Sequence, residues 1–148
     1  SNKAQRYHRL DGVRIDVFKN WDESMVKALP RFSQVSATGS TPLSDGIQYA
    51  MQELNERTET HRVILVLTDG APDCEAVVKR QIRIAAEAGV HIIGIGIGCG
   101  SYYVPTCFPD KHVCVDDIKD LPTELLGVLD GIMFPKRAKR MNLKKMGA

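Results

Sequence analysis

Two oxygen-bearing side chains stand where they could bind a hard metal cation. Asp69 directly follows an apolar run at 63–67, so the end of a rigid element would hold its carboxylate. Thr41 precedes a helical pattern, and its hydroxyl supplies a second oxygen. Such oxygens suit Mg²⁺, which takes oxygen ligands and usually keeps several waters. Each residue also has a structural interpretation, because Asp-Gly is common turn chemistry and Thr is a common helix N-cap.

Other combinations that resemble active sites lack a required feature. A dinucleotide-binding loop, Gly-x-Gly-x-x-Gly, would need glycine where Cys99 or Ser101 stands, so we attribute the glycines at 94–100 to close helix packing. A haloacid dehalogenase-type phosphotransferase would need an aspartate two residues after Asp69, where the chain has Ala71. No P-loop occurs. Zinc binding is not favoured either, because the candidate ligands match no standard paired spacing: Cys99, Cys107, His112 and Cys114.

The hydrophobic pattern predicts strands that alternate with helices. Strands are expected at 13–18, 63–67, 90–97 and 112–115. A short helix at 22–29 should stop at Pro30, and longer helices should begin at Pro42 (capped by Thr41), after Asp73 and at Pro122. The run at 63–67 is apolar throughout, which is typical of a parallel strand covered on both faces. The pattern predicts an α/β protein with a Rossmann-like open, mostly parallel sheet flanked by helices.

Helical spacing predicts which side chains face the core. The inward sets are Leu43, Ile47, Ala50, Met51 and Leu54 in the second helix, Val78, Ile82 and Ala85 in the third, and Leu125, Leu126, Leu129, Ile132 and Met133 in the last. Ligands of such sheets bind beyond the carboxyl ends of the strands. The loops after Leu67, Ile97 and Val115, together with 38–42, therefore form the expected working edge.

Length, composition and charge fit one globular domain with a basic end. The chain has 148 residues, 43% of them hydrophobic and 26% charged. It holds no apolar run of the ~20 residues that span a bilayer and no signal-peptide pattern, so we expect a cytoplasmic location, no membrane contact and four reduced cysteines. The net charge of +2 combines a mildly acidic body with a basic tail at 135–148. Because no aromatic residue interrupts the tail, we expect a solvated terminus and no nucleic-acid partner.

Several segments resemble the von Willebrand factor A (VWA) family. Gly-Ser-Thr-Pro-Leu at 39–43, the apolar run that leads into Thr-Asp-Gly at 68–70, and the strand at 92–98 look like the second half of such a domain. The resemblance implies a metal-ion-dependent adhesion site (MIDAS), which the family builds from an Asp-x-Ser-x-Ser loop, a Thr and an Asp. By resemblance, Thr41 and Asp69 are the Thr and the Asp, and the rim of the site would contain Ser40, Asp73 and Ser101.

The Asp-x-Ser-x-Ser loop does not occur in this sequence. We therefore expect residues 1–134 to be a partial VWA-like domain, without the first strand, first helix and second strand, that binds Mg²⁺ weakly or not at all. The family's strand order would then leave the strand at 63–67 with a free edge. We expect either that the strand at 13–18 pairs with this edge or that two chains form a homodimer across it.

Further segments resemble one VWA subfamily, the VWA subunit of the aerobic cobaltochelatase of cobalamin biosynthesis. They include residues 9–15, Asp-Gly-Ala-Pro at 69–72, Gly-Ile-Gly-Ile-Gly at 94–98 and 101–103, whereas Thr-Pro-Leu at 41–43 is closer to magnesium chelatase subunits. The resemblance implies a non-catalytic binding module that works with an AAA+ ATPase subunit and a large chelatase subunit. One alternative is a VWA domain that serves another AAA+ ATPase in metalloenzyme maturation. An alternative of another class is a Mg²⁺-dependent phosphohydrolase centred on Asp69.

Overall fold

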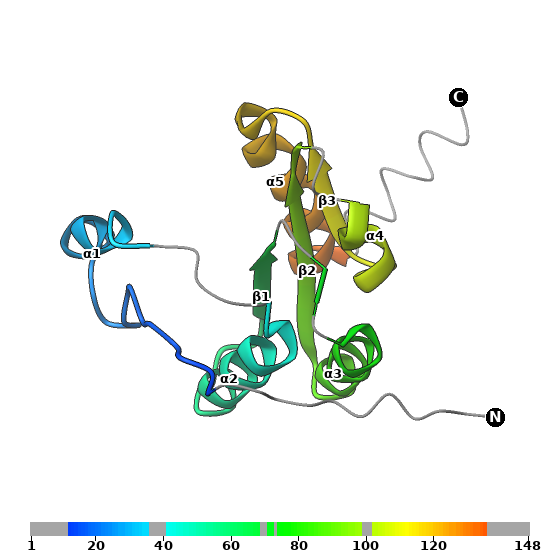
Figure 1. Ribbon diagram of the computed structural model, residues 1–148, viewed down its shortest axis with the longest axis horizontal. Coiled ribbons are helices and arrows are strands. Elements are labelled where there is room, and N and C mark those ends of the chain that lie inside the picture. The colour runs from blue at the N-terminus through cyan, green and yellow to red at the C-terminus, as the bar shows by residue number, and fades with distance from the viewer. Residues whose placement is uncertain (1–11, 36–40, 69–70, 73, 99–101, 136–148) are drawn as a thin grey trace.

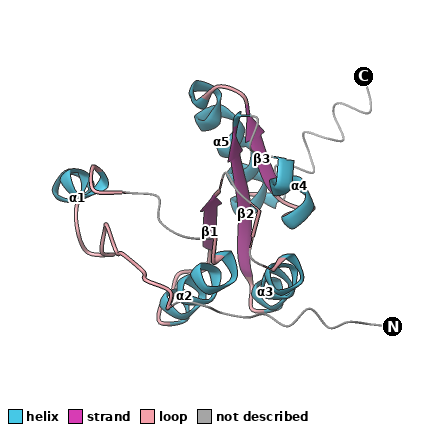
Figure 2. Ribbon diagram, viewed as in Figure 1, coloured by secondary structure: helices cyan, strands magenta, loops and turns pink. Residues whose placement is uncertain are grey.

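Three parallel strands form the centre of the structure. The computed structural model describes residues 12–35, 41–68, 71–72, 74–98 and 102–135. Strands β1 (Arg62–Leu67), β2 (Val90–Ile97) and β3 (His112–Val115) lie in the order β1-β2-β3 and run in the same direction. Figure 2 shows this small open sheet among its helices. The predicted α/β class is confirmed, and β2 and β3 have the bounds that the sequence pattern predicts.

Helices cover both faces of the sheet, but unequally. One face packs against α2 (Leu43–Asn55), α3 (Glu75–Glu87) and the short α4 (Tyr103–Cys107), and the other against α5 (Leu121–Met133) (Figure 1). The first core is the larger, and its most deeply buried side chains include Ile47, Val78, Val90, Val104 and Phe108. The second core joins α5 to the buried residues Ile93, Ile95, Val113 and Val115.

β1 is well covered on one face only, which corrects the expectation of burial on both. Ile64 and Val66 are buried in the first core, whereas Leu65 is 46% and Leu67 66% exposed. The reason is the position of α5, whose core partners lie mainly on β2 and β3. An apolar run shows that a strand can be buried, but the neighbouring helix decides whether it is.

The predicted inward faces of α2 and α3 are confirmed. Ile47 and Leu54 of α2 are buried, and so are Val78 and Ala85 of α3. α3 ends at Glu87, and Gly89 follows with φ +73°, the left-handed conformation that ends a helix at little cost for glycine.

The inward face of α5 is narrower than predicted. Leu125, Leu129 and Ile132 pack into the second core, but Leu126 and Met133 are exposed, so the prediction is wrong for these two. Successive residues of an α-helix are about 100° apart around the axis, because a turn takes 3.6 residues. The residues of α5 that contact the second core recur at helical spacing, and Leu126 and Met133 fall outside this stripe.

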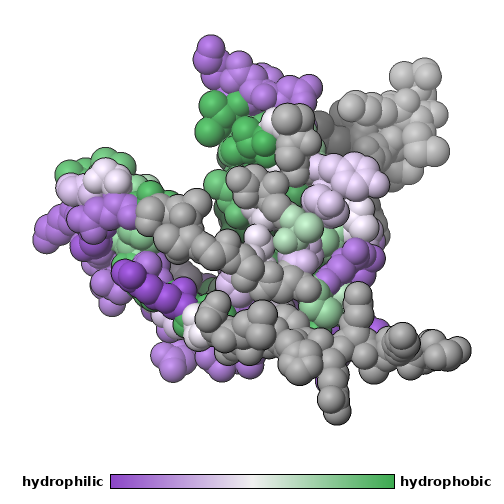
Figure 3. Space-filling model, in the orientation of Figure 1, coloured by the Kyte–Doolittle hydropathy of each residue, from purple (hydrophilic) through white to green (hydrophobic). Residues whose placement is uncertain are grey.

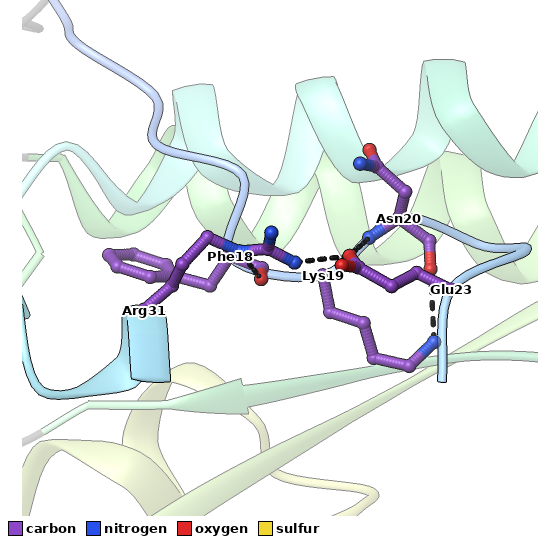
Figure 4. Close-up of polar contacts among 5 residues, drawn as sticks. All are labelled: Phe18, Lys19, Asn20, Glu23 and Arg31. Atoms are coloured by element: carbon purple, nitrogen blue, oxygen red, sulfur yellow. Dashed lines mark hydrogen bonds and ion pairs between the residues drawn. The ribbon is translucent and has the colours of Figure 1, made fainter. Parts of the chain in front are cut away.

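The N-terminal segment differs most from the sequence prediction. Residues 13–18 form no strand, and Ile15 and Val17 are exposed. The helix α1 (Met25–Phe32) begins later than predicted and continues through Pro30. Proline removes one helical hydrogen bond. The last turn persists because the Arg31 guanidinium donates to the Phe18 carbonyl at 2.7 Å and pairs with Glu23, as Figure 4 shows.

Gly94 permits a close approach between β2 and the residue that follows α4. A Cβ atom at this position would lie 2.3 Å from the Cδ2 atom of Phe108, whose ring is buried in the first core. Close packing, which the sequence analysis assigned to the β2 glycines, therefore explains Gly94. The element packed against it is the end of a short helix and not one of the long ones.

Candidate functional site

The carboxyl ends of the strands lie together at one edge of the sheet. β1, β2 and β3 end at Leu67, Ile97 and Val115, and all three strands are parallel. The Thr68 N–H donates to the Ile95 carbonyl at 3.2 Å, so the β1–β2 ladder continues to the residue before Asp69. The backbone hydrogen bonds of the sheet therefore hold the chain in place up to the residue before Asp69, at the expected working edge.

Thr41 belongs to this edge. The helix that follows it, α2, packs on β1 and joins it through the short connection 56–61, so α2 must run antiparallel to β1. Its N-terminal end accordingly lies towards the end of β1. Thr41 is half-buried there, and its carbonyl accepts a hydrogen bond from the Leu43 N–H at 2.8 Å.

The N-cap position of α2 is occupied by Pro42, which corrects the expectation that Thr41 caps this helix. The Pro42 carbonyl accepts a hydrogen bond from the Gly46 N–H at 3.2 Å, as the carbonyl of an N-cap residue does, and Leu43 is the first helical residue. The tight turn between Thr41 and Leu43 displaces the helix start by one residue. The N-cap interpretation of Thr41 therefore loses its structural basis.

The other predicted site residues lie outside the described residues: Ser40, Asp69, Asp73 and Ser101. Their described neighbours in the sequence are Thr41 before α2, Thr68 after β1, Cys74 at the N-cap of α3, and Tyr102 before α4. The structure thus brings Thr41 and the end of β1 to one edge, while the positions of the remaining side chains stay predictions.

Two carboxylates at the end of β3 were not chosen from the sequence. Asp117 has a structural role, since its side chain accepts a hydrogen bond from the Lys119 N–H at 3.0 Å and caps the 3₁₀ turn η2 (Ile118–Asp120). Asp116 is exposed beside it. The available signal for Asp116 was its position directly after a predicted strand, and Asp117 is the next residue. Asp116 is a useful control for Asp69, because both aspartates follow a strand of the same sheet.

The described cysteines are free thiols, as predicted. Cys74 is partly exposed, Cys107 is buried and Cys114 is exposed, while Cys99 lies outside the described residues. Burial raises the pKa of the Cys107 thiol and keeps it protonated. Cys74 is the N-cap of α3 and not a residue within the helix, where we expected it. Within the described ranges, no group of three or more His, Cys, Asp or Glu side chains could hold a metal ion.

Charged groups elsewhere in the structure show perturbed ionisation. In the N-terminal segment, hydrogen bonding from Arg31 lowers the pKa of Glu23, whose carboxylate also accepts from the Asn20 N–H at 3.4 Å. At the amino end of the sheet, opposite to the candidate site, burial lowers the pKa of His91, and the nearby charges of Lys111 and His61 lower it further. The Lys111 Nζ lies 2.5 Å from the His91 Nδ1.

The lowered pKa of His91 predicts a loss of stability in acid. An unfolded histidine titrates near 6.5. As the pH falls below this value, the unfolded chain takes up the proton before the folded chain does, so the free energy of unfolding should decrease until the folded pKa is passed. Urea unfolding between pH 7 and 5 should show this slope. It should be shallower for His91→Gln and intermediate for Lys111→Met. Equal slopes for His91→Gln and wild type would contradict the assignment.

The fold and the position of the candidate site define the structural class of this protein. The chain is an α/β protein with an open parallel sheet, and its candidate binding edge lies at the carboxyl ends of the strands. Among the described helices, none combines the length and apolar character needed to cross a membrane.

Comparison with known proteins identifies the family. The model of the von Willebrand factor type A domain matches residues 13–105, well over half of the chain, so the chain belongs to this family. VWA domains typically mediate protein–protein interactions. A curated relative, the thrombospondin-related anonymous protein of Plasmodium falciparum, is 27% identical over 122 residues, which are 77% of this chain and 21% of the relative. The matching region thus spans about a fifth of that relative's length.

Proposed function

We propose that the chain is a protein-docking module whose carboxyl edge holds a divalent cation that a carboxylate of the partner completes. Thr41 and Asp69 would bind the cation, and Ser40, Asp73 and Ser101 would line the rim. One observation carries the proposal: Thr41 and the strand end that leads into Asp69 belong to the same edge of the sheet. All five positions also fall inside the range that matches the VWA family.

The donor set suits a hard cation. Hydroxyl and carboxylate oxygens are the ligands that Mg²⁺ takes, and Mg²⁺ commonly binds through one or two carboxylates with several waters retained. When bound, the cation would supply a positive charge that attracts a carboxylate of the partner. Two protein side chains leave most of its coordination positions to water and to the partner, so we expect Mg²⁺ to bind this chain weakly until the partner arrives.

The same module would serve a metal chelatase. The segments at 9–15, 69–72, 94–98 and 101–103 resemble the VWA subunit of the aerobic cobaltochelatase. On this proposal the chain is a non-catalytic, cytoplasmic subunit that docks an AAA+ ATPase subunit and a large chelatase subunit, and the inserted Co²⁺ is cargo. A VWA domain serving another AAA+ ATPase in metalloenzyme maturation would use the same edge with different partners.

Capture of partners by the full-length protein tests this function. In the presence of Mg²⁺, the tagged protein should retain an AAA+ ATPase subunit together with a large chelatase subunit from its native cells. Retention of a different AAA+ ATPase would favour the metalloenzyme-maturation alternative. A chain that binds no ATPase and hydrolyses phosphate esters, with activity lost in Asp69→Ala, would overturn the proposal in favour of a phosphohydrolase.

A further inference from the structure

The amino end of the sheet, opposite to the candidate site, carries two basic side chains on neighbouring strands. Lys111 directly precedes β3, and its carbonyl accepts a hydrogen bond from the Gly94 N–H at 3.1 Å, so the ladder between β2 and β3 extends to it. His91 is the second residue of β2. Because alternate residues of a strand face the same side, His91 and Lys111 lie on the face of Ile93 and Val113, against which α5 packs. Two paired strands therefore hold the two bases on one face.

The contact between the two side chains determines where the histidine carries its proton. The Lys111 Nζ lies 2.5 Å from the His91 Nδ1. An ammonium group has donors but no acceptor, so Nδ1 accepts the hydrogen bond and the proton of the neutral ring lies on Nε2. The pair therefore offers only donors to any further group: the Nε2–H of His91 and the two remaining N–H groups of Lys111. Such a set of donors, one of them charged, suits an oxyanion.

No acid compensates these bases within the part of the chain that the structure describes. His61, directly before β1, adds a third base whose charge acts on His91. The helix on this face, α5, carries two acids, Glu124 in its first turn and Asp130 outside its core-facing stripe. Neither forms an ion pair with Lys111 or His91. The lowered pKa of His91 is consistent with this uncompensated charge.

The pair differs from an ordinary solvated base. Hydrophilic residues are common on the surface of the protein, as Figure 3 shows on several elements, so a basic residue alone marks no site. Lys119, for example, is exposed to water. Lys111 and His91 are instead half-buried, and the lysine directs one of its donors to another base. Half-buried charges are normally paired with a counter-charge, and a bound anion would supply it.

We propose that the amino end of the sheet binds an oxyanion, a carboxylate or a phosphate-like group, through Lys111 and His91, with His61 at the rim. The anion accepts hydrogen bonds from the ammonium of Lys111 and from the Nε2–H of His91. When His91 takes up a proton, Nδ1 becomes a donor and releases Lys111, and the anion then faces two positive charges. Binding is therefore linked to protonation of His91, so the affinity should rise as the pH falls from 7.5 to 6.

Titration with sulfate, followed by NMR, tests the site. Sulfate is an oxyanion that keeps its charge in this pH range, and sodium chloride would hold the ionic strength constant. The signals of His91 and Lys111 should shift to saturation, with an affinity about threefold or more higher at pH 6 than at pH 7.5. The ring of His112 is the internal control, because its Nδ1 donates to the Phe108 carbonyl at 2.8 Å, and it should respond less. Saturation by acetate alone would identify a carboxylate ligand, and by sulfate alone a phosphate-like one.

Three variants separate the site from general ion effects. Lys111→Met should abolish the saturable shifts, whereas Lys119→Met, at the exposed lysine, should retain them. His91→Gln keeps a donor but cannot take up a proton, so it should bind sulfate equally at the two pH values. Shifts of wild type that never saturate with either anion would indicate an adventitious ion only and would overturn the proposal. Equal sulfate binding by wild type and Lys111→Met would overturn it as well.

Discussion

Replacing Gly94 with alanine is expected to destabilise the folded protein by about 3 kcal/mol, the upper part of the range for overpacked cores. The new Cβ would lie 2.3 Å from the ring of Phe108. That ring is 2% exposed and cannot move without opening the core around it. Urea unfolding at one fixed protein concentration would measure the change as a lower midpoint.

Gly46 provides the matched control for this substitution. It lies in α2, it is exposed, and a Cβ there would meet nothing within 4 Å. Gly46→Ala should therefore stabilise the protein by about 0.5–1 kcal/mol. Phe108→Leu replaces the clashing ring by a smaller side chain and should relieve the strain. The double variant Gly94→Ala, Phe108→Leu should therefore lose less free energy of unfolding than the sum of the losses in the two single variants. A neutral Gly94→Ala would contradict the close packing of β2 against Phe108.

Asp69→Ala is expected to weaken the binding of the docked partner by about 2–5 kcal/mol, roughly thirty-fold or more in affinity. The proposed cation links Asp69 to a carboxylate of the partner, so losing Asp69 removes the cation and leaves the partner's carboxylate without its counter-charge. Thr41→Ala should have a smaller effect, about tenfold, because it removes a neutral ligand, and Thr41→Ser should retain binding. Titration of the captured partner against each variant in Mg²⁺ would measure these changes.

Asp116→Ala tests whether the effect of Asp69→Ala comes from the cation site or from the general negative charge of this edge. Asp116 follows β3 at the same edge of the sheet and is exposed, but it has no part in the proposed site. Its replacement should leave the affinity within about twofold of wild type, as is common for exposed charges. Equal losses for Asp69→Ala and Asp116→Ala would indicate that the partner senses only the charge of the edge. Unchanged urea midpoints would show that neither variant acts through unfolding.

Regular elements with a clear hydrophobic period could be predicted from the sequence. β2 is apolar and β-branched through most of its length and is flanked on both sides by packed strands, so pattern and burial agree. The inward residues of α2 and α3 recur at helical spacing, and each helix packs on the larger core. In these elements the local pattern and the tertiary environment favour the same structure.

The failures occur where tertiary context overrides local pattern. Residues 13–18 alternate as a strand does, but alternation alone cannot supply a neighbouring strand for hydrogen bonding, and these residues pair with none of the described strands. Pro30 normally stops a helix, yet the contacts of Arg31 with Phe18 and Glu23 hold the last turn of α1. Leu65 and Leu67 are as apolar as buried residues, but exposure depends on where α5 lies.

The topology of a parallel sheet was enough to predict the edge at which the candidate site lies, but not its details. Parallel strands bring Leu67, Ile97 and Val115 to one edge, and a short connection brings Thr41 there as well. Sequence spacing does not fix the start of a helix to the residue, so it could not show that Pro42 and not Thr41 occupies the N-cap of α2.

Paramagnetic broadening by Mn²⁺ is the most direct test of the central claim that a divalent cation binds at the carboxyl edge. Mn²⁺ takes the same hard oxygen ligands as Mg²⁺, and its effect on amide signals detects weak binding. Substoichiometric Mn²⁺ should selectively broaden the amides of Thr41 and Thr68, leave those of His91 and Lys111 at the opposite end of the sheet sharp, and have no selective effect on Asp69→Ala. Broadening centred on the amino end, or the same selective pattern in Asp69→Ala, would contradict the account.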